Sequence, residues 1–348
     1  MILPVEYPPI TTFHQITDLF TILWARKKEI MPWFADHYIQ LIVKDDDPNN
    51  DWITFYDILF TDYVRPASRC PYFSMQVINR AIPYKELETF TDFVEMQINN
   101  GYYINVCLNQ FHLQCSGAYN KHNYVHDTFI YGYDRGNNKI YIADFYDNQK
   151  YAFKTATYQE INQSNMLDGI DIPYWASEIV LYKYDTSCPY QTNTILLKQS
   201  LKDYLLGEDN LGKYIYTFDK YKCSDKCSDP NIKKPIYGVD CYDAISKHCL
   251  EFKKDLDAIA LHLLYDHKTA MQIRLNYLYE NNYLHVQGIE TLMTLYAKLR
   301  DDTLILRNLS LKYKLHGSDE FLEKLVAKCQ TIKENDKKLT SEILQRIK

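Results

Sequence analysis

The sequence predicts an α+β protein in which a domain built on an antiparallel sheet is followed by a helical bundle. The clearest observation is a β-hairpin, because residues 124–131 and 139–145 are rich in β-branched and aromatic residues and flank a turn-forming segment. The second is a change after Pro189, where long segments with helical spacing of apolar residues replace short ones. We therefore expect a domain over residues 1–190 and a helical domain over 191–348.

The first domain begins with a helix. Apolar residues recur at helical spacing from Ile16 to Trp24, and Thr11 or Thr12 can cap the start of this helix. Residues 52–63 fit either a strand or a helix. The further elements predicted in this domain are a helix that starts at Cys70-Pro71, a helix over residues 86–99 ended by Gly101, and strands at 102–109, in 151–161 and at 175–184.

The second domain is predicted to be an up-down bundle, because its long helical segments are joined by short connections. The expected helices cover residues 192–207, 240–252, 255–280, 289–315 and 319–347. In the third of them, His267, Lys268 and Arg274 interrupt a core helix. These three residues either face a cleft between the domains or lie on a solvated helix face.

Composition excludes several classes of protein. The net charge of −6 and a pI near 5.9 argue against nucleic acid as a partner. No apolar run is long enough to span a membrane, and the first residues do not resemble a signal peptide. The nine scattered cysteines, an odd number, favour reduced thiols and a cytoplasmic location. The 32 tyrosines are compatible with a polar, aromatic groove.

Cofactor and metal motifs are not found in the sequence. There is no GxGxxG, P-loop or HExxH motif. Cys223 and Cys227 form a C-x3-C pair, but neither Cys241 nor His248 follows at a spacing that would complete a zinc site. We therefore expect no cofactor and no metal, with Cys223 and Cys227 as two thiols of a loop.

The hairpin carries a histidine and an aspartate that can meet. If Gly132 to Asn138 is the whole loop, His126 lies directly opposite Asp144, with Cβ atoms roughly 5 Å apart. A loop of only 136–138 leaves the two about four residues out of step on one face, and an odd offset puts them on opposite faces. The contact is therefore predicted to need the long loop. The alternative is a cross-strand pair that serves only the sheet.

A cysteine, a histidine and a carboxylate can form a nucleophilic triad, in which the carboxylate orients the imidazole and the imidazole activates the thiol. His126 and Asp144 fit two of these roles. Cys70 is the candidate nucleophile, because the predicted helix start and Arg69 would favour its thiolate form. Cys107 and Cys115 are the next candidates, and a buried structural thiol is the alternative for Cys70.

The same residues resemble a known family. Gly101-Tyr-Tyr-Ile-Asn-Val, His126 with Ile130-Tyr-Gly-Tyr-Asp, and Ile142-Ala-Asp-Phe resemble the papain-like cysteine-peptidase fold. Within it they are most similar to the butirosin-H type of N-acyltransferase of natural-product clusters. Leu201-Lys-Asp-Tyr-Leu-Leu-Gly, Tyr237-Gly-Val-Asp-Cys-Tyr and His267-Lys-Thr-Ala-Met-Gln-Ile-Arg resemble longer members that accompany thiotemplate assembly lines.

The resemblance implies an amide synthase of antibiotic or other natural-product biosynthesis. Such enzymes move an acyl group from the phosphopantetheine thioester of an acyl or peptidyl carrier protein to a cysteine, and then to a small amine. His126 would be the base and Asp144 its orienting group. A thiol hydrolase or peptidase of the same fold, and a degenerate module that only binds a carrier protein or a peptide, are the alternatives. The acyl group, the amine and the oligomeric state are left open.

The sequence departs from this family at the nucleophile. Papain-like enzymes usually carry the cysteine at the start of the first long helix, with a glutamine a little earlier as the oxyanion donor. Here that helix holds His14, Gln15 and Thr21 but no cysteine. Either Cys70 supplies the thiol from another element, or the triad is incomplete.

Overall fold

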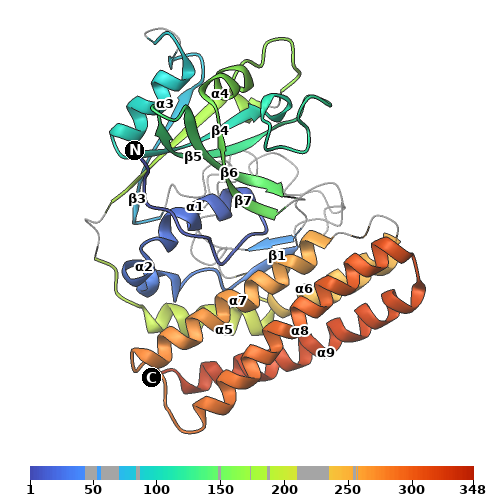
Figure 1. Cartoon of the computed structure of the whole chain (residues 1–348). Helices are drawn as coiled ribbons and strands as arrows, with labels where there is room; N and C mark the ends of the chain where they lie inside the picture. The colour runs from blue at the N-terminus through green and yellow to red at the C-terminus, as the bar shows by residue number, and fades with distance from the viewer. Residues whose placement is uncertain are drawn as a thin grey trace, which may run out of the picture. The chain divides into compact units, whose positions relative to one another are not determined.

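The computed structural model (Figure 1) describes residues 1–43, 53–55, 70–83, 87–147, 150–172, 174–185, 189–209, 235–253, 256 and 258–348. Arg69, Cys188, Cys223 and Cys227 lie outside these residues. The protein is a mixed α+β protein with antiparallel sheets and a helical C-terminal region, as the sequence predicts.

The chain forms two compact units. The first comprises Met1–Lys27 and Asp62–Pro189, and the second comprises Lys28–Thr61 and Tyr190–Lys348. The units part after Pro189, close to the predicted boundary. Residues 28–61, which the sequence analysis places in the first domain, cluster with the second unit instead.

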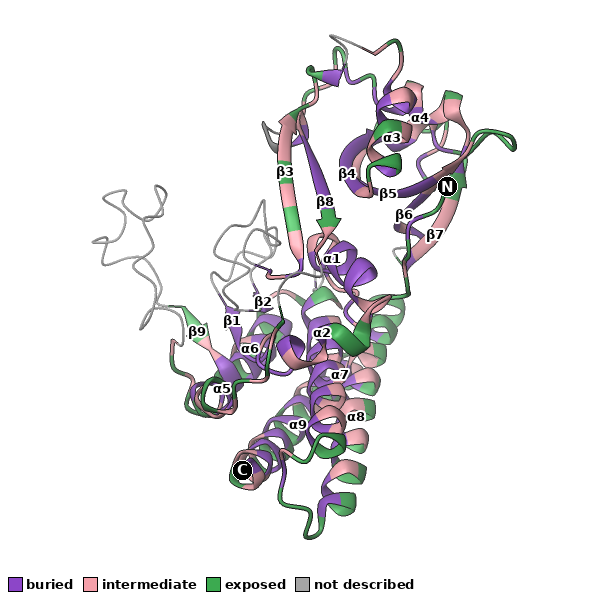
Figure 2. Cartoon of the chain, turned by 90° about the vertical axis from the view of Figure 1, so that its left-hand side faces the viewer, coloured by how far each residue is buried: buried purple, intermediate pink, exposed green. Residues whose placement is uncertain are grey.

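A six-stranded antiparallel sheet forms the centre of the first unit. Its strands, in spatial order, are β3 (Phe73–Asn79), β8 (Glu178–Tyr184), β4 (Tyr102–Asn109), β5 (Val125–Asp134), β6 (Lys139–Asp147) and β7 (Lys150–Ala156). The inner strands β4 and β8 are buried along most of their length, whereas the edge strand β3 has several exposed residues (Figure 2). Burial of both faces matches their high content of β-branched and aromatic residues.

Three helices pack against this sheet or beside it: α1 (His14–Trp24), α3 (Phe90–Asn99) and α4 (Tyr158–Ser164). Helix α1 has Phe13 as its N-cap, with no side-chain hydrogen bond, so the predicted threonine cap is wrong. Asp18 attaches α1 to the sheet by accepting hydrogen bonds from Asn105 Nδ2 (2.7 Å) and from the Tyr151 hydroxyl (2.9 Å).

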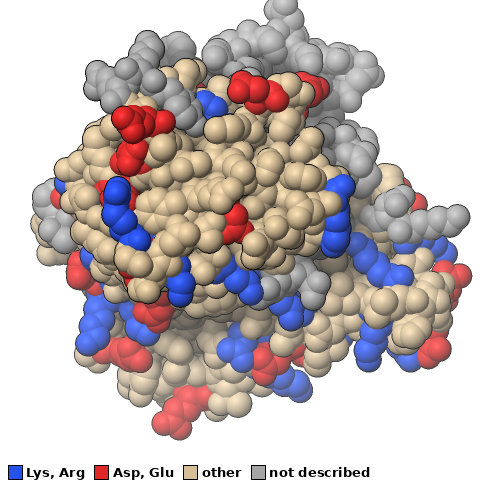
Figure 3. All heavy atoms as spheres, turned by 45° about the horizontal axis from the view of Figure 1, so that its top comes forward, with Lys and Arg blue, Asp and Glu red and all other residues tan. Residues whose placement is uncertain are grey.

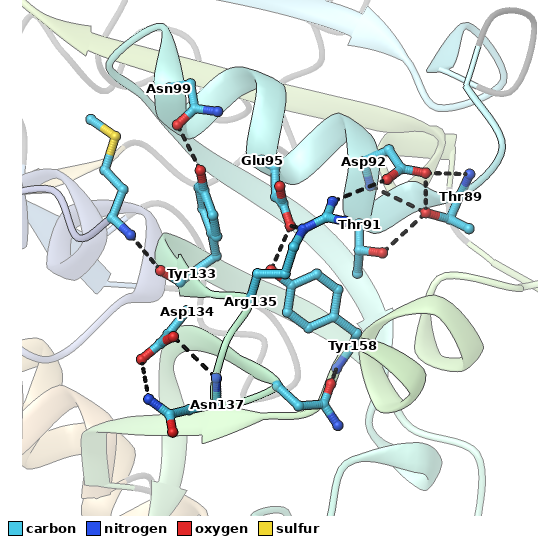
Figure 4. A network of polar contacts seen from close by, with 12 residues as sticks. Thr89, Thr91, Asp92, Glu95, Asn99, Tyr133, Asp134, Arg135, Asn137 and Tyr158 are labelled. Atoms are coloured by element: carbon cyan, nitrogen blue, oxygen red, sulfur yellow. Dashed lines mark hydrogen bonds and ion pairs between the residues drawn. The ribbon is translucent and has the colours of Figure 1, made fainter.

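Helix α3 begins at Phe90, behind a capping box in which Thr89 and Asp92 exchange hydrogen bonds. It ends before Gly101, whose φ of +81° is readily adopted by glycine, as the sequence predicts. Figure 4 shows how the hairpin turn is held to α3 by Arg135, whose guanidinium contacts Asp92 and donates to Glu95 at 2.9 Å. The position of the β5–β6 turn is therefore fixed from outside the hairpin.

The predicted helix at Cys70 is wrong, because β3 begins three residues later at Phe73. Pro71 allows a helix to start, but the segment from Phe73 to Asn79 pairs along its whole length with β8. The pairing of seven residues with a neighbouring strand outweighs the preference of one proline for the first position of a helix.

The second unit combines helices with a small sheet. Its helices are α2 (Lys27–Phe34, whose first residue belongs to the first unit), α5 (Thr194–Leu206), α6 (Cys241–Glu251), α7 (Ala258–Glu280), α8 (Ile289–His316) and α9 (Asp319–Arg346). Helix α8 packs on both α7 and α9, in the predicted up-down order. The three-stranded sheet of β2 (Ile53–Phe55), β1 (Leu41–Val43) and β9 (Ile236–Tyr237) was not predicted, so this unit is not purely helical.

The three residues predicted to interrupt the core helix α7 are buried, so the prediction of a solvated or cleft-facing surface for them is wrong. Lys268 and His267 have no exposed surface, and Arg274 is 1 % exposed. The guanidinium of Arg274 donates to the backbone carbonyl oxygens of Ala35 (2.7 Å) and His37, which follow α2. It thereby satisfies carbonyl groups at a helix C-terminus and ties this early segment to α7.

Lys268 belongs to a polar cluster in the centre of the bundle. Its ammonium group lies 2.5 Å from Oδ2 of Asp336 on α9. The same carboxylate accepts hydrogen bonds from the hydroxyls of Tyr204 (2.5 Å) and Tyr242 (3.1 Å), while Thr340 donates to its other oxygen. The Tyr296 hydroxyl of α8 donates to that oxygen as well, at 3.5 Å, so all five helices from α5 to α9 meet at one buried carboxylate.

Candidate active site

The structure brings His126 and Asp144 together. Nδ1 of His126 donates to Oδ2 of Asp144 at 2.8 Å, and the carboxylate is only 2 % exposed. The two residues come from the neighbouring strands β5 and β6. Their contact was predicted from the hairpin; a chemical role for the pair remains a proposal.

The register that produces this contact differs from the predicted one. The strands continue to the pair Asp134–Lys139, so the loop is short, and a β-bulge separates this part from the pair Phe129–Ala143. Without the bulge, the tight turn would place His126 and Asp144 on opposite faces of the sheet. The extra residue of the bulge returns them to one face, where Asp144 lies opposite Thr128 and diagonal to His126. The long loop is therefore not needed.

Asp144 is held from a second side. Nε2 of Gln110 donates to Oδ2 of Asp144 at 2.7 Å, and the Ser116 hydroxyl donates to Oε1 of Gln110 at 2.6 Å. The backbone amide of Phe145 donates to Oδ1 at 2.7 Å. Gln110 and Ser116 were not identified from the sequence. The one available signal was the place of Gln110, directly after the predicted strand 102–109.

The imidazole of His126 is partly exposed and its Nε2 atom has no hydrogen-bond partner among the described residues. Burial lowers the pKa of His126, but the hydrogen bond and the negative charge of Asp144 outweigh burial and raise this pKa above its ordinary value. The ring of Tyr124 stacks on the imidazole, with centroids 5.4 Å apart and planes inclined by 19°. His126 is thus an oriented base with one open nitrogen.

A second histidine–aspartate pair adjoins the first. Nε2 of His14, the first residue of α1, lies 2.7 Å from Oδ2 of Asp127. The rings of His14 and His126 have centroids 5.5 Å apart. Burial lowers the pKa of His14, but Asp127 outweighs burial and raises it to about 9. His14 is named in the sequence analysis only as a residue at the position of a missing cysteine, and Asp127 is not singled out.

Asp18 lies one turn below His14 in α1 and is 3 % exposed. Burial raises the pKa of its carboxyl to about 8. A folded-state pKa above the unfolded value of 3.8 means that folding favours the protonated form. The contribution of this group to stability is therefore present below about pH 4 and is lost as the pH rises towards 8.

Replacing Asp18 with asparagine is expected to reduce this pH dependence, because the amide cannot ionise. Asp18→Asn should gain stability relative to the wild type when the pH is raised from 5 to 8.5. Urea unfolding of both proteins at the two pH values measures the difference. A difference between the two proteins that does not change with pH would show that the buried carboxyl does not titrate in this range.

The structure does not bring Cys70 to the histidines. Cys70 lies next to Phe73, at the end of the sheet where Tyr102 begins β4. His126 pairs with Leu108 near the other end of β4, and the stretch from Tyr102 to Leu108 spans roughly 20 Å at the usual strand rise. Direct proton transfer between His126 and the Cys70 thiol is therefore excluded in this structure.

The other described thiols of this unit, those of Cys107 and Cys115, have unfavourable surroundings for a nucleophile. Cys107 is 1 % exposed and its Sγ donates to Oδ1 of Asp127 at 3.4 Å. Burial, and then the charge of Asp127, raise the pKa of Cys107 well above its ordinary value. Burial and Glu160 raise the pKa of the half-buried Cys115 to about 12. Both side chains are therefore thiols rather than thiolates at neutral pH.

The described residues were also compared with the requirements of metal sites and of membrane-spanning helices. Within the described residues, no three histidine, cysteine or acidic side chains are grouped so that they could hold a metal ion. None of the described helices combines the length and the apolar composition needed to cross a membrane. On the face drawn in Figure 3, lysine and arginine side chains are interspersed with aspartate and glutamate.

No protein-family model matches the chain, and the search of curated proteins gave no match.

Proposed function

We propose that the first unit is an acyltransferase that forms amides, taking an acyl group from the phosphopantetheine thioester of a carrier protein and passing it to a small amine. His126 is the general base and Asp144 holds its imidazole in the useful tautomer. The contact between His126 Nδ1 and Asp144, which leaves Nε2 open, is the observation that carries this proposal. No metal and no tightly bound cofactor takes part.

A papain-like arrangement is part of the proposal. Such a fold needs a helix that starts beside a histidine, with an acidic or amide residue on the next strand. The start of α1 at His14 and the adjacent strands of His126 and Asp144 supply these three elements. The odd number of scattered cysteines, together with the use of a carrier protein, leads us to place the reaction in the cytoplasm.

The thioester donor makes this reaction favourable without ATP, because an amide is more stable than a thioester. The protein must then position the two substrates and remove a proton from the attacking amine. Positioned general bases typically contribute about 10²–10⁴-fold to a rate. One oriented histidine with an open nitrogen is suited to this step.

The proposal is tested by incubating the purified protein with an acetyl-loaded and an aromatic acyl-loaded carrier protein, each with a panel of primary amines. Mass spectrometry follows loss of the acyl group from the carrier and formation of the amide. Amide formation that is lost in His126→Gln supports the proposal. Free acid as the sole product would identify a hydrolase, and carriers that stay loaded while binding the protein would identify a binding module. Either result would overturn it.

A further inference from the structure

The start of α1 supplies a second side chain to the site that the proposed reaction does not yet use. His14 and His126 approach each other with their ring planes at 61° and centroids 5.5 Å apart. Each imidazole is fixed by its own carboxylate through one nitrogen, His14 through Nε2 and His126 through Nδ1. Among the described residues, Nδ1 of His14 and Nε2 of His126 have no hydrogen-bond partner.

The charges around His14 favour its protonated form. Asp127 of β5 is in direct contact with His14, and Asp144 of β6 also contributes a negative charge. Asp18, one turn along α1, adds its charge only as the pH rises towards its pKa of about 8. The two histidines oppose each other's protonation, since a cation at His14 lowers the pKa of His126. The surroundings thus make one histidine of the pair the cation and leave the other available as the base, which is the pattern of an acid–base pair.

None of the described cysteines contacts the histidine pair. Among the described residues no cysteine side chain is hydrogen-bonded to either imidazole. The Cys107 thiol donates a hydrogen bond to Asp127, the same carboxylate that His14 contacts. An acyl group could reach Cys107 only after that buried hydrogen bond was broken and the thiol deprotonated beside a carboxylate.

We propose that the His14 cation is the oxyanion donor of this site and that the acyl group passes directly from the thioester to the amine between the two histidines, with no acyl-enzyme intermediate. This inference rests on the proposed function, which requires only His126 as the base. It goes beyond that function by excluding a cysteinyl intermediate and by naming the side chain that stabilises the oxyanion.

The step balances without a further reactant. The amine nitrogen attacks the thioester carbonyl carbon, a C–N bond forms, and His126 Nε2 takes the proton that the nitrogen loses. The carbonyl oxygen becomes an oxyanion, which accepts a hydrogen bond from Nδ1–H of the His14 cation. When the oxyanion collapses, the C–S bond breaks and the carrier thiolate takes the proton from His126. The products are the amide and the carrier thiol, and both histidines return to their starting states.

The pH dependence of the wild-type rate is the first test. The rate should rise with pH as His126 loses its proton and fall again as His14 loses its proton near pH 9. In His14→Gln the fall near pH 9 should disappear and kcat should decrease by about 10²–10³-fold, the usual effect of removing one oxyanion donor. His112→Gln, on the nearby 3-10 helix Gln110–His112, is the matched control and should keep the wild-type profile.

The second test is rapid quenching followed by intact-protein mass spectrometry, on the wild type and on a variant that combines Cys107→Ala with Cys115→Ala. We expect no acyl mass on the wild type during turnover and normal amide formation by the double variant. An acyl adduct on any cysteine that decays into product at the rate of turnover would overturn direct transfer while leaving the proposed acyltransferase intact. Wild-type kcat in His14→Gln would overturn the role of His14.

The third test does not depend on activity. Nuclear magnetic resonance titration of the imidazole of His126 should give a higher pKa in His14→Gln than in the wild type, because the neighbouring cation is gone. Thermal melting of the variant first establishes that it folds. An unchanged pKa of His126 would show that the two histidines are not coupled, whatever reaction the protein catalyses. If the wild type forms no amide, the proposed function fails, and this titration still tests the histidine pair.

Discussion

Replacing Asp336 with alanine is expected to lower the free energy of unfolding by about 3–5 kcal/mol, the usual effect of removing one partner of a buried ion pair. The ammonium of Lys268 has no exposed surface and lies 2.5 Å from this carboxylate. Without Asp336 this amine would be buried with no counter-charge, so it would either stay charged at a high cost or lose its proton. The hydroxyls of Tyr204 and Tyr242 would lose the same acceptor.

Urea unfolding followed by circular dichroism measures this effect, and two variants sharpen it. Lys268→Met combined with Asp336→Leu removes both charges and should recover a large part of the loss. Glu320→Gln disrupts an exposed ion pair with Lys324 on the same helix as Asp336 and should leave the unfolding curve nearly unchanged. An unfolding midpoint of Asp336→Ala equal to that of the wild type would refute the assignment of Asp336 as the centre of the bundle.

His126→Gln is expected to decrease kcat for amide formation by about 10²–10⁴-fold while the protein stays folded. The glutamine side chain fills a similar space and can still reach Asp144, but it cannot accept the proton of the amine. The exposed fraction of His126 is large enough that its replacement should have little effect on stability. Steady-state rates of amide release measure the loss.

Asp144→Asn separates orientation from proton transfer. The imidazole stays in place, but the pKa of His126 should fall because the charge and the hydrogen bond of Asp144 hold it up. The rising limb of the rate against pH should therefore move to lower pH, with a lower plateau because the tautomer is no longer fixed. A rising limb that does not move in Asp144→Asn would show that the limb does not report on His126.

Much of the fold follows from short-range patterns in the sequence. Strand β4 lies where alternation places it, at Tyr102–Asn109, and the five helices after Tyr190 begin and end within a few residues of their predicted limits, whereas α2 was not predicted. The register of the hairpin does not follow from such patterns, because a β-bulge adds one residue without a distinctive composition. The contact between His126 and Asp144 was therefore predicted by a geometry that the protein does not use.

The missed and misplaced residues share one cause. His14 and Asp127 are more than a hundred positions apart, and no local spacing indicates that they pair. From the sequence around it, Lys268 would be expected on a solvated helix face. It is buried because Asp336, on a helix two elements later, supplies a counter-charge. At Cys70 a local signal was misleading. Pro71 favours the start of a helix, but the following residues pair with β8, which lies about a hundred positions later in the chain.

The path of the chain between the two units has a consequence for how the protein folds during synthesis. The chain enters the second unit at Lys28, returns to the first at Asp62 and leaves it again after Pro189. Arg274 and the backbone after α2 that it binds are made far apart in time. The nascent segment around α2 must wait for α7, so its apolar side chains are open to chaperones or to aggregation until the ribosome has made α7.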